Sequence, residues 1–171
     1  MRLTPEILTP DAFAPFGQLL HAGGGERFMI NDGWAQRHHR LAEPDVDTGG
    51  GRCIISLFQA TRRPFPLEIA MLERHPLGSQ AFLPADPQPW LVVVAEGDAP
   101  RVQDCRAFLA SGEQGVQYAK GVWHHPLLIL AKTQNFWVVD RAGDGDNLEE
   151  VHFPDPCCLS GISALDDLNI A

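Results

Sequence analysis

The chain has 171 residues and a formal net charge of −9, from 22 acidic and 13 basic residues. Such an acidic surface repels the phosphate backbone of nucleic acids, which excludes them as partners, and an anionic ligand would need a local cluster of Arg, Lys or His. Hydrophobic residues make up 44% of the chain and charged residues 20%, which is typical of a globular domain large enough to bury a core.

The features that report on the cellular compartment favour the cytoplasm. The apolar runs are too short to span a membrane, and the N-terminal residues lack the basic start and apolar stretch of a signal peptide. The four cysteines show no CxxC spacing, which favours free thiols in a reducing compartment. We therefore expect a cytoplasmic protein with no membrane partner.

The first predicted element is a short N-terminal helix. Thr9 suits the N-cap position and Pro10 the first helical position. After this helix, helical periodicity vanishes, and short apolar or alternating runs are separated by turn residues. The predicted strands are residues 17–21, 27–31, 35–39, 52–60, 67–75, 80–83, 90–95, 106–109, 116–118, 127–131, 136–140 and 150–153.

Many short strands at close spacing predict an all-β domain that closes as a sandwich or barrel. No internal repeat or linker divides the chain, so we expect a single domain over residues 1–171. Within it, residues 154–171 are expected to form a loosely attached C-terminal tail, whose last residues form at most one amphipathic turn.

The strand predicted at residues 67–75 carries the first candidate site residues. Successive side chains of a strand point to opposite faces, so the odd-numbered positions are expected to share one face. Three of them are apolar, which turns that face toward the core, and Glu73 and His75 continue the row at the strand's end. This is the arrangement expected of a barrel with an apolar floor and a polar mouth.

A second block, Gly121-Val122-Trp123-His124, completes a metal-binding pattern. Cupin barrels combine a His-x-His pair, a Glu a few residues later and a distant Gly-x-x-His. Here Glu73 and His75 occupy the pair, Gln80 replaces the Glu, and His124 ends the second motif. Imidazole and carboxylate groups are good ligands for divalent first-row metals, whereas the Gln oxygen is a weaker one. The candidate metal ligands are therefore Glu73, His75, Gln80 and His124.

Two longer strings make the resemblance more specific. Leu72-Glu73-Arg74-His75-Pro76-Leu77-Gly78-Ser79-Gln80 and Val122-Trp123-His124-His125-Pro126-Leu127 resemble the signature of the ureidoglycolate lyase family, formerly called ureidoglycolate hydrolases. Ile30-Asn31-Asp32-Gly33 and the pair Asp140-Arg141 also resemble the family. The similarity runs from about residue 3 to residue 153.

The resemblance implies a cupin-like β-barrel of the double-stranded β-helix (jelly-roll) type and a homodimer. It also implies a carbon–nitrogen lyase of the amidine-lyase type, which cleaves ureidoglycolate to glyoxylate and urea in allantoin degradation and nitrogen utilisation. Nickel or a similar divalent metal has been associated with members of the family, and no organic cofactor is expected.

This chemistry assigns roles to the candidate residues. Elimination of urea needs a base near the substrate hydroxyl, and His124 is the first candidate, followed by His75, because imidazole titrates near neutral pH. Glu73 is expected to orient a histidine, act as base or bind metal. The motif spacing favours His124 over His125 for the barrel interior, unless a bulge or turn at Pro126 reverses the two.

The substrate's two ends need different partners. Gln80 and Tyr118 are candidates for the urea end. For the carboxylate the options are Arg141, Arg74, Arg37 and Lys120, since guanidinium groups match carboxylates with paired hydrogen bonds. Strand alternation turns Arg74 away from Glu73, and Asn31 is a further residue expected to border the site.

Two other functions remain open from the sequence. One is a metal-dependent cupin isomerase or dioxygenase, which the mixed ligand set disfavours. The other is a non-catalytic cupin that binds a small ureido or carboxylate ligand, which only the family resemblance distinguishes from the lyase.

Overall fold

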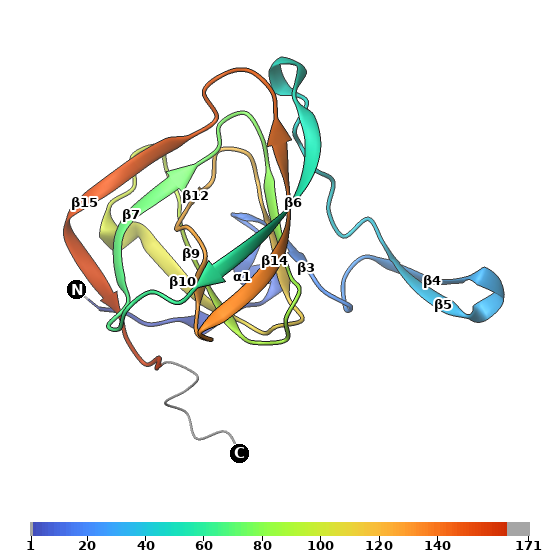
Figure 1. The fold of residues 1–171 in the computed structure, drawn as a ribbon, viewed down its shortest axis with the longest axis horizontal. Coiled ribbons are helices and arrows are strands. Elements are labelled where there is room, and N and C mark those ends of the chain that lie inside the picture. Colours follow the sequence, from blue (N-terminus) through green and yellow to red (C-terminus); the bar gives the residue numbers. More distant parts are fainter. Residues whose placement is uncertain (1, 164–171) are drawn as a thin grey trace.

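The computed structural model describes residues 2–163 and contains two curved β-sheets, with a two-stranded arm that extends to one side (Figure 1). The first sheet has eight strands, in the order β1 (Arg2–Leu3), β15 (Glu149–Leu159), β7 (Glu68–Arg74), β12 (Trp123–His124), β9 (Trp90–Ala95), β10 (Cys105–Ala110) and β2 (Glu6–Ile7), with β13 (Leu128–Ile129) also paired to β9. The second has the order β3 (Gly17–Leu20), β11 (Gly115–Tyr118), β8 (Gln80–Pro84), β14 (Thr133–Ala142) and β6 (Arg52–Thr61).

The predicted all-β, cupin-like barrel with a short N-terminal helix is confirmed. The helix α1 spans Pro10–Phe13, and the side chain of Thr9 caps it by accepting a hydrogen bond from the backbone N–H of Ala12 at 3.3 Å. Short 3-10 turns cover Asn31–Gly33, Thr48–Gly50 and Val102–Asp104. Within the described residues, no helix is long and apolar enough to cross a membrane.

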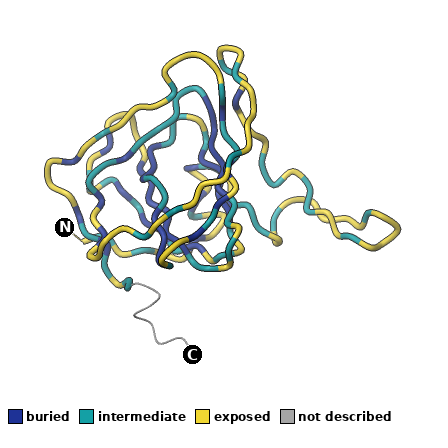
Figure 2. Tube along the Cα trace, viewed as in Figure 1, coloured by how far each residue is buried: buried dark blue, intermediate teal, exposed yellow. Residues whose placement is uncertain are grey.

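The central strand β9 is buried on both faces, as Figure 2 shows for the middle of the molecule. Trp90, Val92 and Val94 join an aromatic-rich cluster between the two sheets. The intervening residues of β9 join a second cluster, enclosed by the curl of the larger sheet. Alternation of side chains therefore builds two apolar layers from one strand, and these layers support the strands that carry the site.

The predicted face of β7 is wrong in part. Leu67 and Ile69 are buried in the second cluster, but Leu72, at the opposite parity, is buried there too. The pairing of β15 with β7 shifts its register between His152 and Cys157, whose partners are Met71 and Ile69. The extra residues lie in β15, opposite Ala70, and they interrupt the ladder at the point where the buried side of β7 changes. Glu73 and His75 thus do not continue the apolar row, although they do come together.

The C-terminal tail predicted from residue 154 is a strand as far as Leu159. Residues 154–159 continue β15, where Cys157 pairs with Ile69 of β7 and Cys158 pairs with Arg2 of β1. The side chains of Cys157 and Leu159 are buried in the second cluster, so burial holds this segment in place. The turn predicted at residues 163–171 lies almost wholly outside the described residues. All four cysteines are free.

The arm consists of β4 (Glu26–Ile30) and β5 (Ala35–His39), which pair only with each other and leave the barrel to one side (Figure 1). It exposes large apolar side chains, including Met29 at 55% and Trp34 at 90%. The edge strand β6 and its neighbour β14 expose others, including Ile55 and Trp137. Exposed apolar patches of this kind are typical of protein–protein contact surfaces.

Candidate active site

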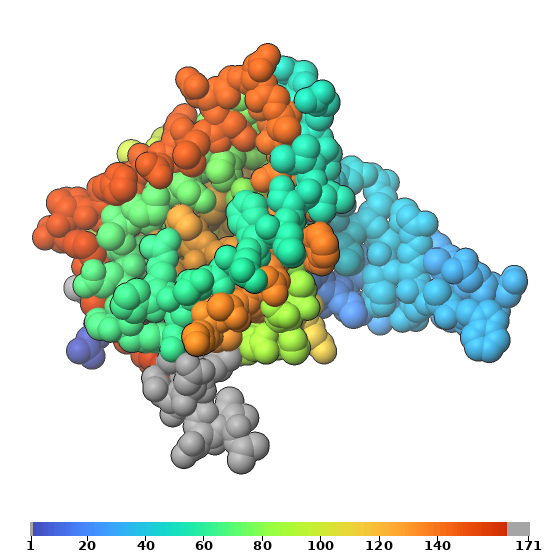
Figure 3. Space-filling model, viewed as in Figure 1, coloured from blue at the N-terminus to red at the C-terminus, as the bar shows by residue number. Residues whose placement is uncertain are grey.

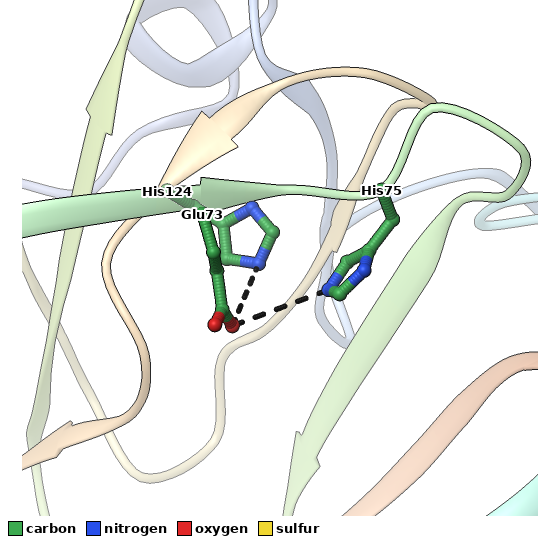
Figure 4. Close-up of side chains that lie close together, drawn as sticks. All are labelled: Glu73, His75 and His124. Carbon is green, nitrogen blue, oxygen red and sulfur yellow. Dashed lines mark ion pairs between the residues drawn. The ribbon is translucent and has the colours of Figure 1, made fainter. Parts of the chain in front are cut away.

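Three predicted residues converge at one end of the barrel: Glu73, His75 and His124 (Figure 4). Glu73 lies in β7 and pairs directly with His124 of β12, while His75 follows the end of β7. Glu73 Oε1 lies 3.6 Å from His124 Nε2 and 4.0 Å from His75 Nε2. One ligand atom from each residue, a carboxylate oxygen of Glu73 and a ring nitrogen of each histidine, lies within 4.8 Å of the other two. We call these residues the mouth triad.

In its neutral form, each imidazole of the mouth triad presents an unprotonated nitrogen to the centre. His75 Nδ1 lies 2.7 Å from the carbonyl oxygen of Asn147, and His124 Nδ1 lies 2.9 Å from that of Val122. Because a carbonyl oxygen only accepts, each neutral ring must carry its proton on Nδ1. Nε2 of each ring is buried and has no hydrogen-bond partner in the described part of the chain. These are two lone pairs held ready for a ligand.

Burial governs the electrostatics of the triad. Loss of solvent lowers the pKa of His124 to about 3, so this ring is neutral at physiological pH. Burial also raises the pKa of Glu73, against the opposing effect of His75. The ring of Tyr118 stacks on His124 with centroids 4.1 Å apart and planes 12° apart. This contact fixes the orientation of the His124 ring.

Gln80 lies beside the triad, as predicted. It begins β8, pairs with Tyr118 of β11, and is 8% exposed. Its Oε1 atom is buried, with no hydrogen-bond partner among residues 2–163. Gln80 therefore adds a third lone-pair donor that no protein group occupies.

Two cavities open on this region, and Gln80 lines both of them. The first, of ≈ 400 Å³, reaches Glu73 and Gln80 and is walled mainly by β6. It is visible as the hollow between β6 and β7 in Figure 3. The second, of ≈ 320 Å³, reaches His75 and Gln80 and contains Asp140 and Arg141. A small molecule in either cavity would touch both Gln80 and the mouth triad.

The donor set fits a divalent metal ion. Two imidazole nitrogens, a carboxylate oxygen and the Gln80 oxygen suit first-row divalent ions, and within residues 2–163 the two Nε2 atoms and Gln80 Oε1 have no hydrogen bond that a metal would have to break. The hydrogen bonds at both Nδ1 atoms are the outer contacts that metal-ligating histidines commonly make. The residues that would hold the ion are Glu73, His75, His124 and Gln80.

Several predicted residues are not brought to the triad. Lys120 forms an ion pair with Asp45 at 2.9 Å and donates to Thr48, so its charge is used in fixing a loop. Asn31 lies at the tip of the arm, away from the barrel of its own chain (Figure 1). Arg37 belongs to the same arm.

Arg74 points away from the site, as strand alternation predicted. Its guanidinium binds Glu149 at 2.6 Å and lies over the ring of Trp123. His125 is buried outside the triad, with Nδ1 donating to the carbonyl of Pro126 at 2.7 Å. The spacing argument for His124 over His125 thus agrees with the geometry.

Arg141 lines the second cavity, but loop carbonyls occupy its guanidinium. Nε and Nη2 donate to the carbonyl of Thr48, Nη2 also to that of Asp144, and Nη1 to that of Gly143. We call this arrangement the loop clamp. A Cβ at Gly78 would lie 2.7 Å from Cβ of Arg141, so the glycine of the first motif makes room for the clamp.

Two residues of the cavities were missed as individual site residues. Asp140 lies in the second cavity, and its pKa is raised by burial. Arg63 lies in the first, where its charge acts on Glu73 and His125. The signal for Asp140 was its position one residue before Arg141 at the end of an apolar strand. Arg63 follows β6 in a segment with no pattern that sequence alone could interpret.

The fold and the site together define an enzyme-like cupin barrel with a polar mouth built from two imidazoles and a carboxylate. A sequence model described as "Ureidoglycolate lyase" matches residues 1–160. The chain belongs to the ureidoglycolate lyase family, and its members' name marks it as a lyase.

Curated relatives agree over most of the chain. A ureidoglycolate lyase of Pseudomonas syringae pv. tomato is 53% identical over 88% of this chain and 89% of its own. One from Burkholderia mallei is 49% identical over 92% and 93%, respectively. Among solved structures, a Bacillus subtilis oxalate decarboxylase aligns with 68% of this chain and 31% of its own, with 14% identity and a TM-score of 0.36.

Proposed function

We propose that this chain cleaves ureidoglycolate to glyoxylate and urea at the mouth triad. The observation that carries the proposal is a pair of buried nitrogen atoms, on His75 and His124, that have no hydrogen-bond partner among the described residues and lie around the Glu73 carboxylate, in a member of the ureidoglycolate lyase family. The isomerase, dioxygenase and binding-only alternatives have no comparable support. The reaction breaks a carbon–nitrogen bond, which makes the enzyme a lyase of the amidine-lyase type.

The elimination requires a proton to move between two atoms on one carbon. The hydroxyl proton leaves, the oxygen forms the aldehyde carbonyl, and the carbon–nitrogen bond breaks with its electron pair going to nitrogen, which takes up a proton. Because hydroxyl and nitrogen share a carbon, a single carboxyl group can accept the first proton and return it to nitrogen. Glu73 suits this role, since burial raises its pKa and its Oε1 atom faces both imidazoles.

The histidines complete the site in different ways. His124 is wholly buried, with a pKa lowered to about 3, which makes it a poor general base. Within the proposal it is a neutral acceptor that orients the substrate or holds metal, as its stacking on Tyr118 suits. His75 borders the second cavity and is the alternative base.

A divalent ion, nickel or a similar metal, is the proposed cofactor of this site, held by Glu73, His75, His124 and Gln80. When bound, such an ion supplies a Lewis acid that lowers the pKa of the substrate hydroxyl and stabilises the developing alkoxide. Ion content by elemental analysis, before and after chelation, identifies it independently of turnover.

The proposed assembly is a homodimer located in the cytoplasm. Support for the dimer comes from the exposed apolar side chains of the arm, Phe28, Met29 and Trp34, and from the apolar surface of the edge strand β6. An unpaired edge strand with exposed apolar residues is normally covered. In such a dimer the arm residue Asn31 would belong to the contact region or to the partner's site. Size-exclusion chromatography with light scattering gives the oligomeric state.

The deciding experiment measures urea and glyoxylate release by the purified protein. Equimolar release of both products, well above the spontaneous rate, supports the lyase. The same assay after exhaustive chelation and metal return tests the cofactor. Release at only the spontaneous rate, with metal supplied, would contradict the proposed function.

A further inference from the structure

Three polar side chains form a row across the second sheet, next to the mouth triad. Tyr118 of β11 pairs with Gln80 of β8. On the other side, β8 pairs with β14 as far as Ala81 and Val139, so Gln80 and Asp140 are the next cross-strand neighbours. Directly opposite residues in antiparallel strands share a face, so the three side chains project to the same side. His75, Gln80 and Asp140 all line the second cavity.

Two hydrogen-bond acceptors in this row, on Gln80 and Asp140, have no donor among the described residues. Gln80 Oε1 and Asp140 Oδ1 are both buried, and neither has a hydrogen-bond partner in the part of the chain that the structure describes. The guanidinium of Arg141, which lines the same cavity, donates instead to loop carbonyls. Buried acceptors without donors destabilise a fold, so their retention indicates a ligand that brings donors.

Asp140 also bears on the orientation of the Gln80 amide. A carboxylate only accepts, so the amide turns its N–H group toward Asp140 and keeps Oε1 for the cavity. The pKa of Asp140 is consistent with this contact: burial raises it, while a hydrogen bond from Gln80 and the charge of His75 act in the opposite direction.

The ligand that fits these acceptors is rich in N–H groups and small. A ureido group offers N–H bonds on both nitrogen atoms around a planar carbon. We propose that Asp140 is a specificity-determining residue, whose carboxylate accepts N–H groups of the substrate's ureido end, together with the lone pair of Gln80 Oε1 that a metal ion at the mouth triad leaves free. This inference rests on the proposed function, since it assigns that substrate's orientation: the ureido end in the second cavity, the reacting carbon at the mouth triad.

The first test changes the ligand and leaves the protein intact. N-carbamoylglycine has the carboxylate and ureido group of the substrate but lacks the hydroxyl, so it binds without reacting. N-acetylglycine replaces its terminal NH₂ by a methyl group of similar size. The metal-loaded wild-type protein is expected to bind N-carbamoylglycine at least about tenfold more tightly by calorimetry, because a site built for N–H donors rejects a ligand that leaves its acceptors unpaired.

The second test changes the protein. Asp140→Asn keeps the shape but replaces a carboxylate acceptor by a mixed donor and acceptor. We expect it to weaken N-carbamoylglycine binding by about tenfold or more and to reduce the preference over N-acetylglycine toward unity, while N-acetylglycine binding changes less than about threefold. Asp155→Asn removes the same charge from an exposed residue outside both cavities and is expected to leave both affinities unchanged.

The outcomes separate this inference from the proposed function. Equal affinity of the wild-type protein for the two ligands overturns the inference whatever the variants do, and an equal loss of both ligands in Asp140→Asn overturns the assignment to Asp140. If the protein turns over ureidoglycolate but binds the two analogues equally, the lyase function is supported and the proposed acceptor pair is contradicted. Absence of both turnover and analogue binding removes the function on which the inference rests.

Discussion

The mouth triad and the loop clamp lie close together, around the same second cavity, but they treat polar groups in opposite ways. In the loop clamp, Arg141 is buried and all of its nitrogen atoms donate to carbonyls of two loops. In the mouth triad, His75 and His124 keep buried nitrogen atoms without partners. Satisfied buried groups stabilise a fold, whereas unsatisfied ones cost free energy that a structural role does not recover. The triad is thus built for a ligand and the clamp for stability.

The largest expected effect is on turnover, from Glu73→Gln. The amide keeps the shape of the carboxyl but cannot carry the proton, so we expect the rate of urea release to fall by about 10²–10⁴-fold. Thermal unfolding should change little or move upward, because the substitution removes a carboxyl that burial disfavours in its charged form. A rate within tenfold of wild type would show that Glu73 is not the proton carrier.

The second largest effect is expected for His75→Ala, which should weaken metal binding. Removing one imidazole from the set of Glu73, His75, Gln80 and His124 should lower the affinity for a divalent ion by at least about tenfold, measured by competition with a metal indicator. The control is His152→Ala: this histidine is exposed and lies 3.7 Å from Glu150. Equal metal binding by both variants would contradict the site.

The sequence predicted which residues come together at the site better than it predicted the strand pairing that holds them there. The spacing of two motifs placed Glu73, His75, Gln80 and His124 together because residues on paired strands meet wherever the barrel brings the strands side by side. It could not reveal the bulge opposite Ala70, which depends on how β15 pairs with β7 over a long separation in sequence. Glu73, His75 and His124 therefore come together at the mouth, although the argument about faces was partly wrong.

The basic residues Arg141 and Lys120 show more clearly what the sequence alone could not predict. Arg141 and Lys120 were reasonable carboxylate partners from residue type alone. Their actual partners are the carbonyl of Thr48 and the carboxylate of Asp45, in a loop whose path carries no periodic signal. Residue type indicates what a side chain can bind, but only the fold shows whether another protein group already occupies it.

The third prediction concerns the loop clamp. Arg141→Gln leaves the carbonyls of Thr48, Gly143 and Asp144 short of donors, so we expect a loss of about 2–4 kcal/mol in the free energy of unfolding. The rate per folded molecule should fall far less than in Glu73→Gln. Urea-induced unfolding and active-site titration separate the two. A thousandfold loss of rate at unchanged stability would instead make Arg141 a substrate-binding residue.

The smallest effect, on both stability and activity, is expected at Lys120, whose side chain contacts Asp45 and Thr48 of the same loop. Lys120→Met removes an ion pair with Asp45 that is largely exposed to solvent, where screening and side-chain entropy reduce its value to about 0–1 kcal/mol. Neither KM nor kcat should change, because the ammonium group lies outside both cavities that reach the triad. If KM for ureidoglycolate rose tenfold while the unfolding midpoint stayed fixed, the loop would have to move in the complex and bring Lys120 to the substrate. The contrast between occupied and unoccupied polar groups would then hold only for the ligand-free protein.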